Sequence, residues 1–242
     1  MKKFLMFICT LILTLGLFGC DAKVANADDY TIDKEVEITE ELSFDAAKEK
    51  VEELEEAESK YLSYDMKMTM EGSSTTAKFV MIEEKGGVDG SMTMNMDMGI
   101  MKMDIEMYIK DNFVFMEFPG VGKIKAKIPT TEDLDDFTES GMEGVEEYLE
   151  EFYKLAAEHS DKVKVGYDKA GCLILEYADE NAKLRFVFDK NYPVYFYVGL
   201  GTEMVTEMKF SYDKVEVEYP EDFKAEDYKE INWEEFENMD IM

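Results

Sequence analysis

The residues with the most distinctive spacing are methionines that alternate with polar residues through neighbouring stretches of the chain. A thioether packs adaptably against apolar groups, and it can also ligate soft Cu(I). The sulfurs are too many for one metal site, and a core or a cavity wall would contain such a set. The sequence therefore predicts an apolar-ligand cavity with no metal and no cofactor. The lining methionines are Met66, Met68, Met70, Met92, Met94, Met96, Met101, Met103 and Met107.

The side chains that often act in catalysis lack partners. His159 is the only imidazole, and no serine, cysteine or metalloprotease motif accompanies it. A charged imidazole near the end of a predicted helix is favourable with the helix dipole. Cys172 lies beside Leu173, Ile174 and Leu175, where a buried and inert thiol is expected. The sequence therefore predicts that the chain is not an enzyme.

An aspartate cluster and the single arginine could each have a functional role, but each also has a simpler structural explanation. Asp133, Asp135 and Asp136 could hold Ca²⁺ weakly, but the Gly and distal Glu of a calcium loop are missing, which favours a solvated helical turn. Arg185 could meet a ligand carboxylate or phosphate at a cavity rim. Asp and Glu number 56 against 26 Lys and Arg, so a cross-strand pair between Arg185 and an acidic neighbour is the simpler expectation.

The N-terminus has the pattern of an export signal. Lys2 and Lys3 precede an apolar run that ends at Gly19-Cys20. The sequence Leu17-Phe18-Gly19-Cys20 resembles the lipobox of bacterial lipoproteins, in which the cysteine carries diacylglycerol and becomes the new N-terminus. The resemblance implies removal of residues 1–19, lipidation of Cys20 and attachment to the cell membrane outside the cytoplasm. An uncleaved N-terminal helix or ordinary secretion is the alternative.

Charge and cysteine content limit the partners. The net charge of −30 becomes −32 when Lys2 and Lys3 leave with the signal, and such a chain repels nucleic acid. Cys9 leaves with the signal and Cys20 takes the lipid, so Cys172 remains alone and no intrachain disulfide can form. About 200 residues are enough for the core of one domain. We expect a monomer whose partners are the membrane and a lipid or other hydrophobic ligand.

Hydrophobic periodicity predicts the elements that position the methionines. The acidic stretch 20–42 is expected to be a flexible tether, followed by one domain over 43–242. Apolar stripes predict helices over Ser43–Lys60, with Ser43 as N-cap, and Met142–His159. We expect the aromatic-rich segment 220–242 to dock on the body. Period-two alternation between turns predicts eleven or twelve strands: Tyr64–Met70, Ala77–Glu83, two between Ser91 and Lys110, Phe113–Phe118, Lys123–Ile128, Val163–Tyr167, Cys172–Tyr177, Lys183–Phe188, Val194–Val198, Met204–Tyr212 and Val215–Tyr219.

The order of these features resembles the LolA/LppX-like lipoproteins, in particular surface lipoproteins of Gram-positive bacteria that share that fold. The resemblance covers about residues 43–220, ends at Tyr219-Pro220 and is architectural. It implies an α+β fold, an incomplete antiparallel β-barrel with two main helices covering its concave face. Family members carry acyl chains, which implies a lipid-like ligand here but assigns no residue. The alternative is a cell-envelope interaction lipoprotein with a filled core and no small ligand.

Overall fold

The computed structural model describes residues 27–52, 61–84, 87–99, 101–118, 122–128, 148–189, 192–201 and 204–232. The strands of the first meander are β2 (Tyr61–Met70), β3 (Ser73–Glu84), β4 (Gly87–Asp97), β5 (Lys102–Lys110), β6 (Phe113–Phe118) and β7 (Gly122–Lys127). Those of the second are β8 (Val163–Asp168), β9 (Cys172–Ala178), β10 (Ala182–Asp189), β11 (Tyr192–Leu200) and β12 (Met204–Ser211). Both meanders were predicted, with bounds that differ by a few residues.

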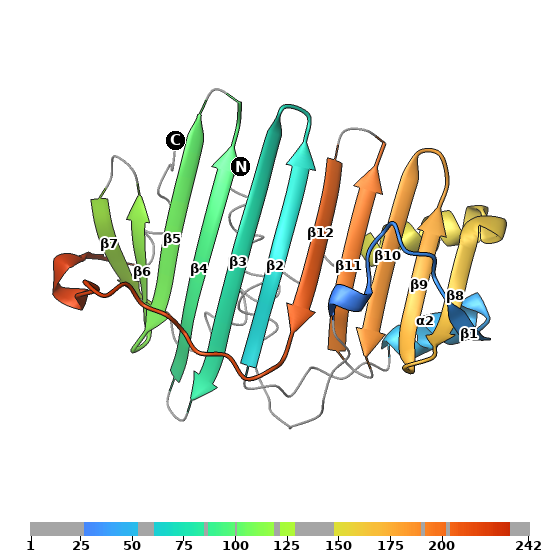
Figure 1. The fold of residues 1–242 in the computed structure, drawn as a ribbon, viewed down its shortest axis with the longest axis horizontal. Helices are drawn as coiled ribbons and strands as arrows, with labels where there is room; N and C mark the ends of the chain where they lie inside the picture. The colour runs from blue at the N-terminus through green and yellow to red at the C-terminus, as the bar shows by residue number, and fades with distance from the viewer. Residues whose placement is uncertain are drawn as a thin grey trace.

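The described strands form one open sheet of 13 strands, including β1 (Ile38–Glu41) and β13 (Lys229–Ile231), in the order β1-β8-β9-β10-β11-β12-β2-β3-β4-β5-β6-β7-β13 (Figure 1). The pairs are antiparallel except that β13 runs parallel to β7. The two meanders join where β12 pairs with β2. An open, largely antiparallel sheet with two helices is thus confirmed, while the predicted strand number is too low because both edge strands were missed.

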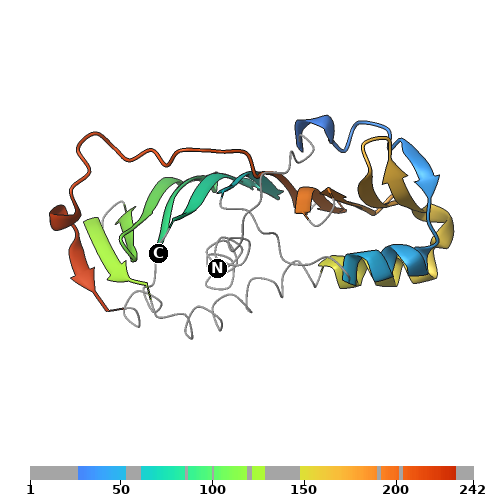
Figure 2. The same cartoon turned by 90° about the horizontal axis from the view of Figure 1, so that it is seen from below.

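Both helices lie on the concave side of the sheet, at its β8 end (Figure 2). They are α2 (Phe44–Glu52) and the helical residues 148–158. Ser43 caps α2 as predicted, because its Oγ accepts a hydrogen bond of 3.2 Å from the backbone N–H of Ala46. The predicted helical residues 53–60 and 142–147 lie outside the described residues. None of the helices that the structure describes has the length and apolarity to cross a membrane.

Residues 27–41 lie on the sheet, so the expectation of a flexible tether is wrong for them. β1 pairs with β8, and η1 (Ala27–Asp29) lies on the convex side (Figure 2). Tyr30, Val36 and Ile38 pack against a convex-side cluster that includes Cys172 and Tyr195. These apolar residues follow no period, so the sequence pattern alone does not reveal that they cover an apolar patch.

Residues 212–232 cross the convex face and dock on it, as expected, and the rest of the predicted docking segment, 233–242, lies outside the described residues (Figures 1 and 2). Tyr219, Phe223 and Tyr228 pack against Tyr108 and Phe115 of the sheet. The chain then passes through η3 (Ala225–Asp227) into β13, which pairs with β7. The predicted strand over residues 215–219 is wrong. β12 already has β11 and β2 on its two sides, so the segment that follows finds no free strand edge there.

Candidate functional site

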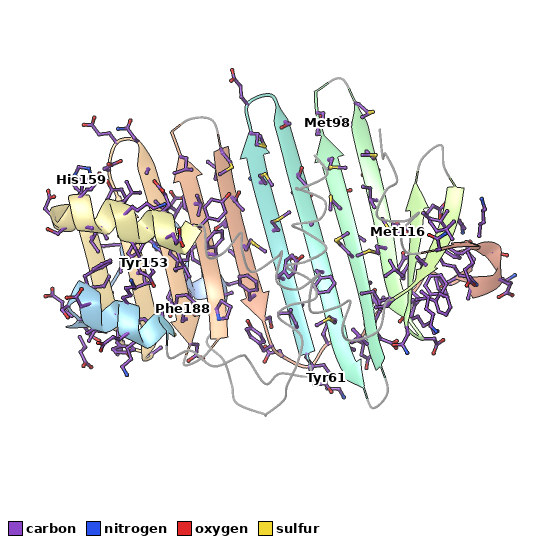
Figure 3. All side chains as sticks on the ribbon, turned by 180° about the vertical axis from the view of Figure 1, so that it is seen from behind. Tyr61, Met98, Met116, Tyr153, His159 and Phe188 are labelled. Carbon is purple, nitrogen blue, oxygen red and sulfur yellow. The ribbon has the colours of Figure 1, made fainter. Side chains whose placement is uncertain are left out.

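In the described strands, every methionine lies on the same face of the sheet. Residues directly opposite each other in paired strands point to one side, and alternate residues of a strand share a face. Met66, for example, pairs with Met208 of β12 and with Ala77 of β3, and Ala77 pairs with Met94. Figure 3 shows the sulfur atoms on the side that carries the helices. The set is Met66, Met68, Met70, Met81, Met92, Met94, Met96, Met103, Met107, Met116, Met204 and Met208.

This face has two halves that differ in composition. The half formed by β8–β11 carries branched and aromatic side chains, and the helices pack on it. The ring of Phe152 lies 5.8 Å from that of Phe186, and the ring of Tyr148 lies 5.6 Å from that of Phe196. The half formed by β12 and β2–β6 carries the methionines together with a buried aromatic cluster of Tyr64, Phe79 and Phe210. One row across nine strands reads Val165, Leu175, Phe186, Phe196, Met208, Met66, Ala77, Met94 and Ile105.

The methionines predicted to line a cavity divide by burial. Those in the interior are Met66, Met68, Met92, Met94 and Met107, each at most 7% exposed. Those toward one rim are Met96 and Met103, which are half-buried, and Met70 and Met101, which are 48% and 47% exposed. The structure thus brings all nine together on one half of one face and places them at different depths. Sequence reasoning missed Met81, Met116, Met204 and Met208 because other apolar residues dominate their strands.

A hollow of about 400 Å³ lies on the opposite, convex face, between η1 and strands β12, β2, β3 and β4. Its lysines alternate with acids across the strands, since Asp65 pairs with Lys209 on one side and Lys78 on the other. Three lysines face three carboxylates in the lining, so the hollow has no excess charge with which to select an ion. Its polar lining is Asp28, Asp65, Lys67, Thr76, Lys78, Thr93, Asn95, Glu207 and Lys209.

Arg185 stabilises the fold and is not at a cavity rim. Its Nε donates a hydrogen bond of 2.6 Å to Oε2 of Glu176, its cross-strand neighbour, as the sequence predicts. The guanidinium also donates to the backbone oxygens of Thr31 and Lys34. Arg185 is 4% exposed and Glu176 is 8% exposed. The buried ion pair therefore holds residues 31–34 on the convex face.

The two other residues considered for catalysis lie away from the methionines. Cys172 is buried on the convex side, and burial raises the pKa of its thiol to about 11. Figure 3 shows His159 at one end of the molecule and Met116 toward the other. Among the described residues, no three His, Cys, Asp or Glu side chains gather closely enough to hold a metal ion. Cys20, Asp133, Asp135, Asp136 and Trp233 lie outside the described residues.

We expect Cys172 to be unreactive toward Ellman's reagent in the native protein. A thiol with a pKa of about 11 is ionised to about one part in a thousand at pH 8, and this one is fully buried. Unfolding in urea should release one additional reactive thiol relative to the Cys172→Ala variant. Rapid reaction of native wild type, absent from the variant, would contradict the buried position.

The concave face can therefore offer a continuous, thioether-rich apolar surface, and the residues described on it bring together no set of acid, base and nucleophile. No protein-family model matches this chain, and no curated protein matches it either. The feature that points to a function is the concave face of β12 and β2–β6, the methionine half.

Proposed function

We propose that this chain is a membrane-anchored extracytoplasmic lipoprotein, non-enzymatic, that binds a hydrophobic, lipid-like ligand against its methionine half. The observation that carries the proposal is the gathering of all strand methionines in the described residues on one half of one face. Methionine is unbranched, with three rotatable bonds and a polarisable sulfur, and it suits surfaces that must accept varied shapes. A core with only a packing role could use the branched and aromatic residues found under the helices.

The architecture agrees with the resemblance to LolA/LppX-like lipoproteins. The sheet is open and curved, and both described helices lie on its concave side (Figure 2). An incomplete barrel of that family holds acyl chains against its concave face, which is the face that carries the methionines here. The agreement supports an acyl compound as the ligand class.

Anchoring at Cys20 would hold the domain close to the membrane. The lipobox resemblance makes Cys20 the attachment point, and residues 27–41 are docked on the sheet. Seven residue steps separate Cys20 from Ala27, and a fully extended chain of that length spans at most about 25 Å. A ligand that leaves or enters the bilayer would therefore have a short distance to travel.

The burial of the interior methionines favours a second candidate function. Met66, Met92 and Met94 are 1–3% exposed, as in a filled core. A cell-envelope interaction lipoprotein would use such a core for stability and its acidic exterior for a cationic or protein partner. It predicts pull-downs that weaken strongly with salt and no bound lipid.

Native mass spectrometry separates the two candidates. Protein purified from its own host should carry a co-purifying acyl compound in about equimolar amount, beyond any covalent lipid at Cys20. Organic extraction should release this compound and leave the covalent anchor. A preparation that shows only the mass of the processed chain would overturn the proposed ligand binding and favour the interaction role.

Two buried positions on the same face provide a matched pair of variants. Met94 is 1% exposed in the methionine half, and Leu184 is 0% exposed under the helices. Met94→Gln and Leu184→Gln each bury an amide, at a similar cost of about 1–3 kcal/mol. We expect Met94→Gln to weaken binding of a fluorescent fatty acid at least about tenfold and Leu184→Gln to change it little. Equal losses would contradict the assignment, and Met103→Gln at the half-buried rim serves if Met94→Gln does not fold.

A further inference from the structure

The methionines that are not buried gather at one rim of the sheet. Met96 of β4 is directly opposite Met103 of β5, and the two are half-buried. The backbone N–H of Met98 donates to the carbonyl oxygen of Met101 at 2.9 Å, which continues the same ladder into the turn. Met98 is half-buried and Met101 is 47% exposed. These four residues, called the tip quartet below, form the end of the β4–β5 hairpin.

The spacing of the tip quartet suits a single ion. Opposite Cβ atoms of an antiparallel pair are about 5 Å apart, and same-face neighbours along a strand are about 7 Å apart. The quartet thus places four thioethers around a small rectangle. The position of each sulfur is set by rotation about two bonds, Cα–Cβ and Cβ–Cγ, so the four sulfurs can converge above the centre of the rectangle. Met92 and Met107 form a similar opposite pair further along the hairpin, but both are buried.

A fifth thioether lies on the neighbouring hairpin. The turns of the two hairpins are adjacent, since a Cβ added to Gly99 would lie 3.4 Å from the backbone oxygen of Gly72. Met70 directly precedes the turn residues Glu71 and Gly72 and is 48% exposed. Met101 is exposed to a similar degree, at 47%, so the thioethers of Met70 and Met101 are both accessible to a solute at this rim.

The face that carries the tip quartet offers thioethers and, opposite Met96, the hydroxyl of Thr75, while the neighbouring carboxylates are placed elsewhere. Asp97 and Asp104 alternate with the methionines and therefore lie on the other face. Asp97 is also occupied, since it pairs with Lys102 at 2.9 Å and accepts a hydrogen bond of 2.9 Å from the backbone N–H of Gly99. Hard cations prefer oxygen ligands, and soft thioethers select Cu(I). We propose that the tip quartet binds one soft monovalent cation, Cu(I) or its analogue Ag(I).

The chain has too many methionines for one metal site, but most of those on this face are buried, and few lie at the rim where an ion can reach them. The number of sulfurs argues against a metal site only if all the sulfurs are equivalent, and the structure separates buried methionines from those at the rim. The charge of the whole chain, −30, also raises the local concentration of cations at its surface. The site shares the rim residues Met96 and Met103 with the methionine half but uses none of the buried rows, so Met94→Gln tests ligand binding without removing a thioether of the quartet.

A competition titration tests the site. The full chain, kept anaerobic, is titrated with Cu(I) in the presence of bathocuproine disulfonate, a chromophoric Cu(I) chelator. We expect one equivalent to bind and the quadruple variant Met96→Leu, Met98→Leu, Met101→Leu and Met103→Leu to lose at least about a hundredfold in affinity. The matched control is Met92→Leu with Met107→Leu, a buried pair on the same hairpin, which should stay within about threefold. Leucine nearly conserves volume, so both variants should fold.

Silver provides a direct spectroscopic readout. In protein labelled with ¹³C at the methionine methyl groups, one equivalent of Ag(I) should shift the signals of the tip quartet and leave those of Met92 and Met107 in place. The proposal is overturned if wild type does not compete with the chelator, if the quadruple variant binds as wild type does, or if the control loses affinity equally. Fatty-acid binding measured on the same samples tests the proposed function separately.

Discussion

Replacing Arg185 by methionine is expected to destabilise the protein by about 3–5 kcal/mol, the usual cost of removing one partner of a buried ion pair. The substitution removes the guanidinium partner of Glu176, which is 8% exposed in the wild type, and leaves its carboxylate only the longer ion pair to Lys164 at 3.9 Å among the described residues. The carbonyl oxygens of Thr31 and Lys34 lose their donor at the same time. We therefore expect residues 27–41 to leave the convex face before the rest of the sheet unfolds.

Urea unfolding and limited trypsin digestion check the two parts of this prediction. Cleavage after Lys34 should be slow in wild type and fast in Arg185→Met. The control is Lys183→Met, which removes a positive charge from an exposed position on the same face of β10 and should change stability by less than about 0.5 kcal/mol. Protection of Lys34 with a stability loss below about 1 kcal/mol in Arg185→Met would show that the ion pair does not hold this segment.

A double variant separates charge burial from loss of the hydrogen bonds to residues 31 and 34. Arg185→Met with Glu176→Leu removes both charges, and replacing a buried pair by apolar residues is often neutral in stability. We expect it to recover much of the free energy of unfolding but to leave Lys34 sensitive to trypsin. Its deviation from the sum of the single variants measures the coupling of the pair.

The strands were predictable because their burial pattern is local. A period of two is set by backbone geometry, so alternation in the sequence identified β6 with the bounds Phe113–Phe118 and placed the β4–β5 hairpin. β1 and β13 have four and three residues, too few to show a period. Their partners, β8 and β7, lie more than a hundred residues away in sequence. The edges of the sheet therefore depend on contacts that no local pattern encodes.

The sequence predicted which face of the sheet carries the methionines, but not how deeply each methionine is buried. Alternation assigns Met94 and Met96 to one face, and the register confirms it. It does not reveal that Met94 is 1% exposed while Met96, two residues along the same strand, is only half-buried. Depth along a strand is set by what packs over each row of the sheet, which is a tertiary property. The division between buried sulfurs and the tip quartet therefore required the structure.

Replacing Gly166 by alanine is expected to expel β1 from the sheet. Gly166 has a φ of +155°, and an added Cβ would lie 2.2 Å from the backbone oxygen of Glu40 and 2.6 Å from Cγ2 of Ile38. Both neighbours belong to β1, so the strand has to move away. Strained backbone at such a φ costs about 1–3 kcal/mol by itself, and the lost pairing adds to this.

Gly171→Ala provides the control, because Gly171 has a φ of +87° but nothing lies within 4 Å of the added Cβ. The Gly171→Ala variant therefore has the strain of an alanine at positive φ but no steric clash between the added methyl group and a neighbouring strand. Hydrogen exchange should show rapid exchange at residues 38–42 in Gly166→Ala, including the amide of Leu42 that donates to Val165 at 3.1 Å, and normal protection there in Gly171→Ala. Equal protection in both variants would mean that β1 accommodates the methyl group.

Gly166 and Arg185 hold the same N-terminal segment from different strands, so the two substitutions should destabilise less than additively when combined. Once the segment is free, the second substitution has fewer contacts left to remove. Release of residues 27–41 would also raise the largest possible distance between Cys20 and the first docked residue, from about 25 Å at Ala27 to about 75 Å at Leu42. If the proposed anchor is correct, either variant should therefore move the methionine half away from the membrane. Slower transfer of a fatty acid to vesicles from the anchored variants, with unchanged affinity in solution, would measure that effect.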